Sequence, residues 1–315
     1  MKSSIVFLYP GQGSQKVGMG HDLYQAYKET RRMFDQADNL LGFSLSRICF
    51  EGPEEKLASD LNAQLAIYTV SCVLTDLLKA NDITPDMASG YSSGFYAAAY
   101  AAGCFNFADG LHLVKKAGEI LLDEGEKIDG SMAVIFGLSS EKVEKICQKV
   151  GNVGLAILNT RRQIIISGLT PSVRKVMEIS LRENALDAYT IPAATAYHSG
   201  FMKQSSIRLS EKINTDFIND PLIPLFSYLS LKPVRTKWEL KDIISRQLSH
   251  PVLWVNLVKK LRNNKNDLFI EVGPGNVISR TVRWIDRNIE ILITDNKNSL
   301  LKAVNRYNQI NSGIK

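Results

Sequence analysis

The stretch GYSSGFYAAAYAAG, residues 90–103, is the part of the sequence on which the fold prediction rests. Its first five residues fit Gly-x-Ser-x-Gly, a sharp turn between a strand and a helix that exposes the central serine. The residues that follow are small, as a helix packed closely beneath such a turn requires. The short apolar segment 87–90 precedes the turn and is typical of a strand. The stretch therefore predicts a strand–turn–helix unit with Ser92 as a candidate nucleophile.

Strands and helices alternate on both sides of this unit. Residues 5–9 form a short apolar run that leads into the glycine loop Gly11-Gln12-Gly13. Periodic apolar residues predict helices over residues 21–41, 64–80 and 107–124. This order is typical of an α/β protein with a parallel sheet.

The middle of the chain has a different pattern. It predicts strands over residues 132–136, 155–159, 163–167 and 188–193, and helices over residues 140–150 and 172–182. The resulting order, β-α-β-β-α-β, is that of the ferredoxin-like unit. Two further helices (238–248 and 252–261) and a strand (268–272) then resume the first pattern. We therefore predict a core of residues 1–127 and 199–315, interrupted by a ferredoxin-like subdomain of residues 128–198.

Composition limits the class of protein. The chain has 315 residues, 45% of them hydrophobic, and contains no apolar run of about eighteen residues, so no transmembrane helix is predicted. The four cysteines have no Cys-x-x-Cys spacing, which favours neither disulfides nor a metal site and fits a cytoplasmic location. The net charge of +6 suits an acidic partner, although a solvated basic surface explains it equally well.

A serine nucleophile needs a general base and donors that stabilise the oxyanion. The turn itself aims the backbone N–H of Ser93 at the site. Of the four histidines, His21 and His112 lie among polar helical neighbours, and His250 precedes a proline at a helix boundary, where it would act as a cap. His198 follows the last strand of the insertion, at a domain junction where clefts form. We therefore predict His198 as the base.

The loop Tyr9-Pro10-Gly11-Gln12-Gly13-Ser14-Gln15 follows the first strand. A glycine loop at the carboxyl end of a parallel strand brings backbone N–H groups close to a ligand. The loop is neither Gly-x-Gly-x-x-Gly nor a phosphate-binding loop with lysine, so nucleotide binding has little support.

Together these motifs resemble the malonyl-CoA:acyl carrier protein transacylases and the acyltransferase domains of polyketide synthases. The resemblance covers nearly the whole chain and rests on segments in the right order and spacing. They are residues 9–15 (YPGQGSQ), 63–66 (AQLA), 90–94 (GYSSG), Asn159 with 164–168 (IIISG), 197–199 (YHS), 246–252 (RQLSHPV) and 271–275 (EVGPG). The family fold is an α/β-hydrolase-like core with a ferredoxin-like insertion, which agrees with the pattern above.

The resemblance implies a role for five residues. Ser92 would attack a thioester carbonyl and carry the acyl group. His198 would take the serine proton and return it to the leaving thiol. The backbone carbonyl of Gln247 would hold the other imidazole nitrogen, and the backbone N–H groups of Gln12 and Ser93 would form the oxyanion hole. No metal or redox cofactor is expected, because the acyl group arrives on the phosphopantetheine of coenzyme A or of an acyl carrier protein.

The predicted substrate-binding residues include three departures from the family. Ala117 stands where the family has an arginine that pairs with the malonyl carboxylate, and the residues three and four away on the helix are all apolar. Lys115 and Lys116 are turned away, so neither replaces that arginine. Tyr91 replaces a histidine and Phe95 a glutamate. The remaining predicted substrate-binding residues, which match the family motifs, are Gln64, Asn159 and Tyr197.

We therefore expect a competent enzyme that acts on uncarboxylated acyl groups held on acyl carrier protein or coenzyme A. We favour hydrolysis of such groups from carrier proteins in polyketide biosynthesis. The alternatives are transfer of an uncarboxylated acyl group, malonyl transfer despite Ala117, and a non-catalytic carrier-binding module. A nucleic-acid binder would need clustered basic and aromatic residues, and Lys259-Lys260-Leu261-Arg262 is too short a cluster. We also expect a monomer that binds no membrane.

Overall fold

The computed structural model describes residues 4–125, 127–193, 195–262 and 267–312. Its larger part is built on a six-stranded sheet with the order β10-β9-β1-β2-β7-β8. The first five strands are parallel to one another and β8 is antiparallel to β7. The strands are β1 (Ile5–Tyr9), β2 (Met87–Gly90), β7 (Leu225–Phe226), β8 (Pro233–Val234), β9 (Leu268–Glu271) and β10 (Glu290–Ile293).

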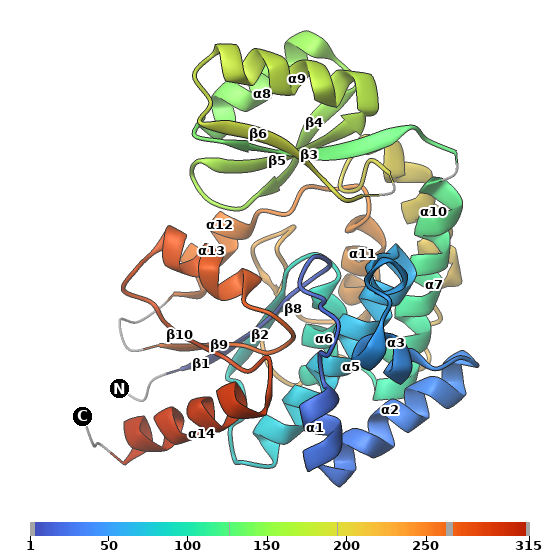
Figure 1. Cartoon of the computed structure of the whole chain (residues 1–315), viewed down its shortest axis with the longest axis vertical. Coiled ribbons are helices and arrows are strands. Elements are labelled where there is room, and N and C mark those ends of the chain that lie inside the picture. Colours follow the sequence, from blue (N-terminus) through green and yellow to red (C-terminus); the bar gives the residue numbers. More distant parts are fainter. Residues whose placement is uncertain (1–3, 126, 194, 263–266, 313–315) are drawn as a thin grey trace.

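Helices surround this sheet on both sides (Figure 1). They are α1 (His21–Ala26), α2 (Lys28–Leu41), α3 (Leu45–Glu51), α4 (Glu54–Ala58), α5 (Asp60–Lys79), α6 (Gly94–Ala101), α7 (Phe107–Gly125), the 3-10 turn η1 (Gly200–Met202), α10 (Lys203–Lys212), α11 (Lys237–Arg246), α12 (Trp254–Leu261), α13 (Val277–Ile285) and α14 (Lys297–Asn311). By length and composition α5 is apolar enough to cross a membrane, but 83% of its most apolar 18-residue window is buried inside the protein, where α5 packs on α6 and α7. It is therefore a core helix.

Several helix predictions differ from the structure at their ends; the helix of 64–80 begins at Asp60 and the helix of 238–248 ends at Arg246. The segment 21–41 is wrong as one helix, because Tyr27 is extended (φ −122°, ψ 129°) and separates α1 from α2. This break lets Leu23 of α1 and Phe34 of α2 both reach the core. The helix predicted over residues 252–261 begins two residues later, at Trp254, because Val252 pairs with Ile157 of a neighbouring strand.

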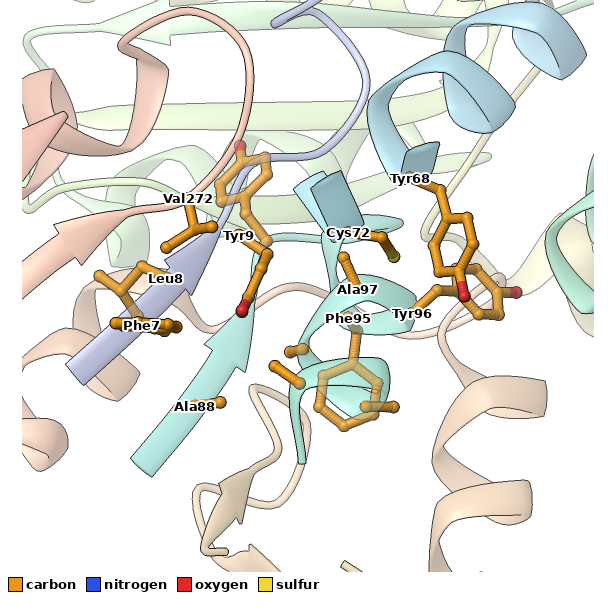
Figure 2. Close-up of a cluster of buried hydrophobic side chains, with 14 of the residues drawn as sticks. Phe7, Leu8, Tyr9, Tyr68, Cys72, Ala88, Phe95, Tyr96, Ala97 and Val272 are labelled. Carbon is orange, nitrogen blue, oxygen red and sulfur yellow. The ribbon is translucent and has the colours of Figure 1, made fainter. Parts of the chain in front are cut away.

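The core of the larger part lies between β1 and the helices α5 and α6 (Figure 2). Phe7, Leu8 and Tyr9 are fully buried, as expected for a central parallel strand that is covered on both faces. The Tyr9 hydroxyl, which needs a partner when buried, lies 2.9 Å from Thr75 Oγ1 of α5. Alanines in the middle of α6 allow this helix to approach the sheet closely, so its first residues are held firmly above β2.

The four remaining strands form a separate sheet with the order β4-β5-β3-β6, in which neighbouring strands are antiparallel. Its elements are β3 (Gly130–Phe136), α8 (Ser140–Val150), β4 (Val153–Leu158), β5 (Gln163–Leu169), α9 (Thr170–Arg182) and β6 (Asp187–Ile191). Both helices cover the outer face of the sheet, above the larger part (Figure 1), and enclose a second apolar core. This is the predicted ferredoxin-like subdomain, and its strands lie inside the predicted limits of 128–198.

The subdomain is fastened to the larger part by a backbone bridge. Ile157 of β4 pairs in parallel with Val252, between α11 and α12. The Val252 N–H donates to the Ala156 carbonyl at 2.8 Å, and the Leu158 N–H donates to the Val252 carbonyl at 2.9 Å. This bridge brings the end of β4 next to the carboxyl edge of the larger sheet.

Candidate active site

Ser92 lies in a tight turn at the carboxyl edge of the parallel sheet. β1 and β2 are neighbours with Tyr9 opposite Gly90, so the loops that follow both strands meet at one edge. A Cβ atom at Gly90 would collide with the backbone of Gly94, and one at Gly94 would collide with the carbonyl of Tyr9. Ser92 itself has a positive φ of 52°, as a serine in such an elbow requires. The close packing explains both glycines of the motif.

His198 reaches Ser92 from the loop between β6 and η1. The distance from Ser92 Oγ to His198 Nε2 is 2.8 Å. His198 Nδ1 lies 3.2 Å from the carbonyl oxygen of His250, which can only accept a hydrogen bond. Nδ1 therefore carries the hydrogen, and Nε2 accepts the hydrogen bond that the Ser92 hydroxyl donates. The predicted base is thus in the tautomer that general-base catalysis needs.

Burial keeps this imidazole neutral. Desolvation lowers the pKa of His198 to about 4, although the carbonyl groups of His250 and Gln247 partly oppose that shift. The prediction named only the Gln247 carbonyl as the partner of the imidazole, whereas the hydrogen bond itself goes to His250. The reason is that the chain turns after α11 and brings both carbonyls toward Nδ1. The Gln247 side chain, which is buried, accepts a hydrogen bond from the Tyr228 hydroxyl at 3.1 Å.

The loop after β1 packs directly on the nucleophile turn. A Cβ atom at Gly11 would collide with the Tyr91 carbonyl, so only glycine allows this approach. The Gln12 N–H donates to Ser93 Oγ at 3.3 Å. Ser93 precedes the first residue of α6, where backbone N–H groups have no helical acceptor. The Gln12 N–H therefore lies next to Ser93, and the roles of these two residues as oxyanion donors stay predictions.

A small cavity of about 40 Å³ opens beside the Ser92–His198 pair. Since one water needs about 10–15 Å³ by this measure, the cavity has room for a short acyl chain. Its lining comes from six regions of the chain and includes no lysine or arginine among the described residues. The lining residues are Gln12, Gln64, Ser92, Ser93, Tyr96, Leu121, Tyr197, His198, Gln247 and Leu248.

Four of the six predicted substrate-binding residues do not line this cavity. The Tyr91 hydroxyl donates to Asn159 Oδ1 at 2.7 Å, so these two side chains join the nucleophile turn to the subdomain. Phe95 is buried against Tyr228, with ring centroids 5.9 Å apart. Ala117 is fully buried in the apolar core. The binding roles of these four residues stay predictions, whereas Gln64 and Tyr197 do lie in the cavity wall.

The sequence analysis missed several residues of the site. Tyr96 and Leu121 lie in the cavity wall one helical turn after Ser92 and Ala117, so helical spacing would have found them. Asp60 lies one turn before Gln64 on α5 and is only 6% exposed. Its carboxylate accepts hydrogen bonds from Gln12 Nε2 and from the Tyr197 hydroxyl. No local pattern predicts these two partners.

The fold and the site define a class of protein: an α/β enzyme with a serine–histidine pair beside a small cavity, and with a ferredoxin-like subdomain next to the larger sheet. A family model described as "Acyl transferase domain" matches residues 6–287, and the chain belongs to this family.

Similar proteins fit this assignment. The malonyl CoA-acyl carrier protein transacylase of Bacillus subtilis is 34% identical over 313 residues, which cover 98% of this chain and 99% of that protein. A polyketide biosynthesis malonyl CoA-acyl carrier protein transacylase of the same organism is 34% identical over 295 residues, 91% of this chain and 99% of that protein. A malonyl-transacylase solved in complex with a type II polyketide acyl carrier protein superposes with a TM-score of 0.92 at 25% identity, over 96% of this chain and 100% of that one.

Proposed function

We propose that this acyltransferase-family enzyme removes short uncarboxylated acyl groups from the phosphopantetheine thiol of an acyl carrier protein, through an acyl-Ser92 intermediate, and releases them to water. The observation that carries the proposal is the hydrogen-bonded Ser92–His198 pair beside a small cavity without a cationic side chain among its described residues. No metal or redox group takes part in the proposed reaction.

In the first half-reaction Ser92 Oγ attacks the thioester carbonyl carbon while its proton moves to His198 Nε2. The backbone N–H groups of Gln12 and Ser93 stabilise the negative charge that develops on the carbonyl oxygen. The tetrahedral intermediate then collapses, the carbon–sulfur bond breaks, and His198 gives its proton to the leaving thiolate. The products are acyl-Ser92 and the free phosphopantetheine thiol.

In the second half-reaction water attacks the ester carbonyl and gives its proton to His198. That proton passes to Ser92 Oγ as the ester bond breaks, so the free acid leaves and the enzyme is restored. The same intermediate also allows transfer, in which a second thiol takes the place of water. Hydrolysis and transfer therefore differ only in the acceptor that reaches acyl-Ser92.

The cavity supports the choice of an uncarboxylated substrate. A malonyl carboxylate would be buried there without a cationic partner, at a cost of several kcal/mol. Ala117, the position at which the family resemblance leads us to expect an arginine, provides only a methyl group that is packed in the core. The volume of about 40 Å³ favours acetyl over longer chains such as hexanoyl.

An acyl carrier protein as partner is supported by the names of the full-length relatives and by the carrier-bound structure of the similar transacylase. Exposed basic residues suit an acidic carrier; they include Arg161 and Arg162, which follow Asn159 in the β4–β5 turn, and Lys203, the first residue of α10. The monomeric state and the cytoplasmic location stay predictions.

Malonyl transfer between coenzyme A and acyl carrier protein is the second candidate. It is favoured by the two relatives above, which are 34% identical over nearly their whole length and carry that name.

One experiment separates the candidates. The protein is incubated with acetyl-, hexanoyl- and malonyl-pantetheine thioesters, and its intact mass is followed over time. We expect an acetyl adduct to form at least about tenfold faster than a malonyl adduct, and to decay in water without an added thiol. An adduct that decays only when a carrier thiol is added establishes transfer. Equal malonyl and acetyl loading contradicts the proposed substrate class and supports the malonyl transacylase.

A further inference from the structure

We infer that Asp60 is a specificity-determining residue whose buried negative charge disfavours acyl groups that carry a carboxylate. This inference rests on the proposed function, because it concerns the substrate that reaches Ser92. Asp60 is the first residue of α5, and only 6% of it is exposed to solvent. It lies behind the wall of the acyl cavity.

Both carboxylate oxygens of Asp60 point toward residues of that wall. Oδ1 accepts a hydrogen bond from Gln12 Nε2, and Oδ2 accepts one from the Tyr197 hydroxyl. Gln12 and Tyr197 both line the cavity. Only one layer of side chains therefore separates the carboxylate from the space that an acyl group would occupy.

The charge of Asp60 has no ionic partner within the described part of the chain, where both of its hydrogen-bond donors are neutral groups. Two donated hydrogen bonds match a carboxylate that acts only as an acceptor. Its position in the first turn of α5 also favours a negative charge, because the N-terminus of a helix is its positive end. The surroundings thus hold the charge in place without cancelling it.

A carboxylated acyl group would bring a second negative charge close to Asp60. Nearby charges repel one another more strongly there than in water, because Asp60 is almost fully buried. A neutral acyl group of the same size meets no such repulsion. Asp60 would therefore create selectivity by repelling carboxylated acyl groups, without adding a favourable contact to neutral ones.

Asp60 also holds Gln12, whose backbone N–H is a proposed oxyanion donor, and Tyr197, which precedes the base His198. A substitution will therefore change the reaction rate with every substrate. The test must measure a ratio between two substrates of equal size, because a purely structural effect of Asp60 would leave that ratio unchanged.

Malonyl- and malonamyl-pantetheine thioesters supply this ratio, because the second replaces the carboxylate with a neutral amide of the same shape. We would measure the rate of adduct formation on Ser92 with both, and with acetyl thioester, for the parent protein and for Asp60→Asn. The malonyl-to-malonamyl rate ratio should rise by at least about tenfold in Asp60→Asn, even if all three rates fall. Asp60→Ser removes the charge in a second way and should shift the ratio in the same direction.

Asp35→Asn is the matched control, since it neutralises an exposed aspartate on α2 and should leave the ratio at the parent value. An unchanged ratio in both Asp60 variants, with acetyl still loaded on Ser92, overturns the role of Asp60 and leaves the proposed function standing. A parent protein that loads malonyl as fast as malonamyl also overturns it. Failure of acetyl to label the parent protein at all would instead refute the proposed function.

Discussion

The two ends of the active site differ in how they are built. At the catalytic end, Ser92, His198, Gln12 and Ser93 lie on loops whose backbone is fixed by collisions that only glycine avoids and by hydrogen bonds to neighbouring carbonyls. At the acyl end, the wall includes side chains from α5, α6 and α7 together with Tyr197 and Leu248, and Ala117 is packed in the core behind it.

This difference separates chemistry from selectivity. The catalytic end depends on backbone geometry, so it tolerates unusual side chains such as Tyr91 and Ser93 next to the nucleophile. The acyl end depends on a few side chains, so single substitutions there can change which acyl group is accepted and leave the reaction itself intact. The following predictions test this comparison, beginning with the largest effect.

Loss of the nucleophile should have the largest effect. Ser92→Ala removes the hydroxyl that is hydrogen-bonded to the base His198 and that carries the proposed ester, so intact-mass measurements should detect no acyl adduct. Ser230→Ala, which changes an exposed serine, should label as the parent does. An adduct that persists in Ser92→Ala on another residue would show that the catalytic end has been assigned to the wrong serine.

Loss of the base should reduce the acylation rate by about a hundredfold or more, the usual scale of general-base catalysis. His198→Ala tests this by single-turnover labelling, and His112→Ala is the control because His112 is exposed on α7. If His250→Ala lost as much activity and His198→Ala lost none, the roles of the two histidines would have to be exchanged.

The acylation rate should be nearly constant between pH 8 and pH 5.5 and should fall only as pH approaches about 4. The reason is that burial lowers the pKa of His198 to about 4, so the base stays neutral far below the usual histidine range. A pH profile of adduct formation measures this. A decline centred near pH 6.5 would mean that the imidazole is solvated in the working enzyme.

The same shift has a consequence for stability. Because the pKa of His198 is lower in the folded protein than the usual 6.5, the unfolded chain binds more protons between these values. The contribution of His198 to the free energy of unfolding is therefore fully present above pH 6.5 and is lost as pH falls toward about 4.

Tyr91→Phe should reduce stability by about 1–3 kcal/mol, because it leaves the buried Asn159 Oδ1 without its donor. Denaturant unfolding measures this change, and Tyr189→Phe, on an exposed tyrosine, is the control. The acetyl-to-malonyl rate ratio should stay unchanged, since Tyr91 does not line the acyl cavity. A changed ratio would show that the acyl end extends as far as Tyr91.

Salt should have the smallest effect, a decrease of several-fold in turnover of an acyl carrier protein as the screening length falls to about 8 Å. A free pantetheine thioester has no acidic helix and should show little salt dependence. Arg161→Glu should weaken the salt dependence of turnover with the carrier protein, and Arg31→Glu on α2 should leave it unchanged. Parallel curves for carrier and thioester would mean that the basic charge takes no part in recognition.

The sequence predicted the features that depend on local patterns. The Gly-x-Ser-x-Gly turn, the parallel sheet and the β-α-β-β-α-β subdomain all follow from periodicity and turn residues, and all are present. The assignment of the family is confirmed by the match over residues 6–287.

Features that depend on distant contacts were missed. Asp60 is separated in the sequence from Gln12 by 48 residues and from Tyr197 by 137, and no helix or strand periodicity predicts contacts at such separations. The carbonyl of His250 was missed because every residue has a backbone carbonyl, so the type of residue does not show which carbonyl accepts the hydrogen bond from the His198 imidazole. The break at Tyr27 was missed because an amphipathic pattern continues across it.

Ser92 and His198 share one further property: both have a positive φ, of 52° and 58°, which is uncommon for residues other than glycine. Such conformations persist only where the surrounding structure enforces them. The positions of the two reacting side chains therefore depend on local tertiary packing, because the backbone of either loop would leave its positive-φ conformation if the residues around it became less tightly packed. On heating, catalytic activity should disappear before the bulk of the secondary structure, and it reports the integrity of this edge of the sheet more sensitively than any global probe of folding.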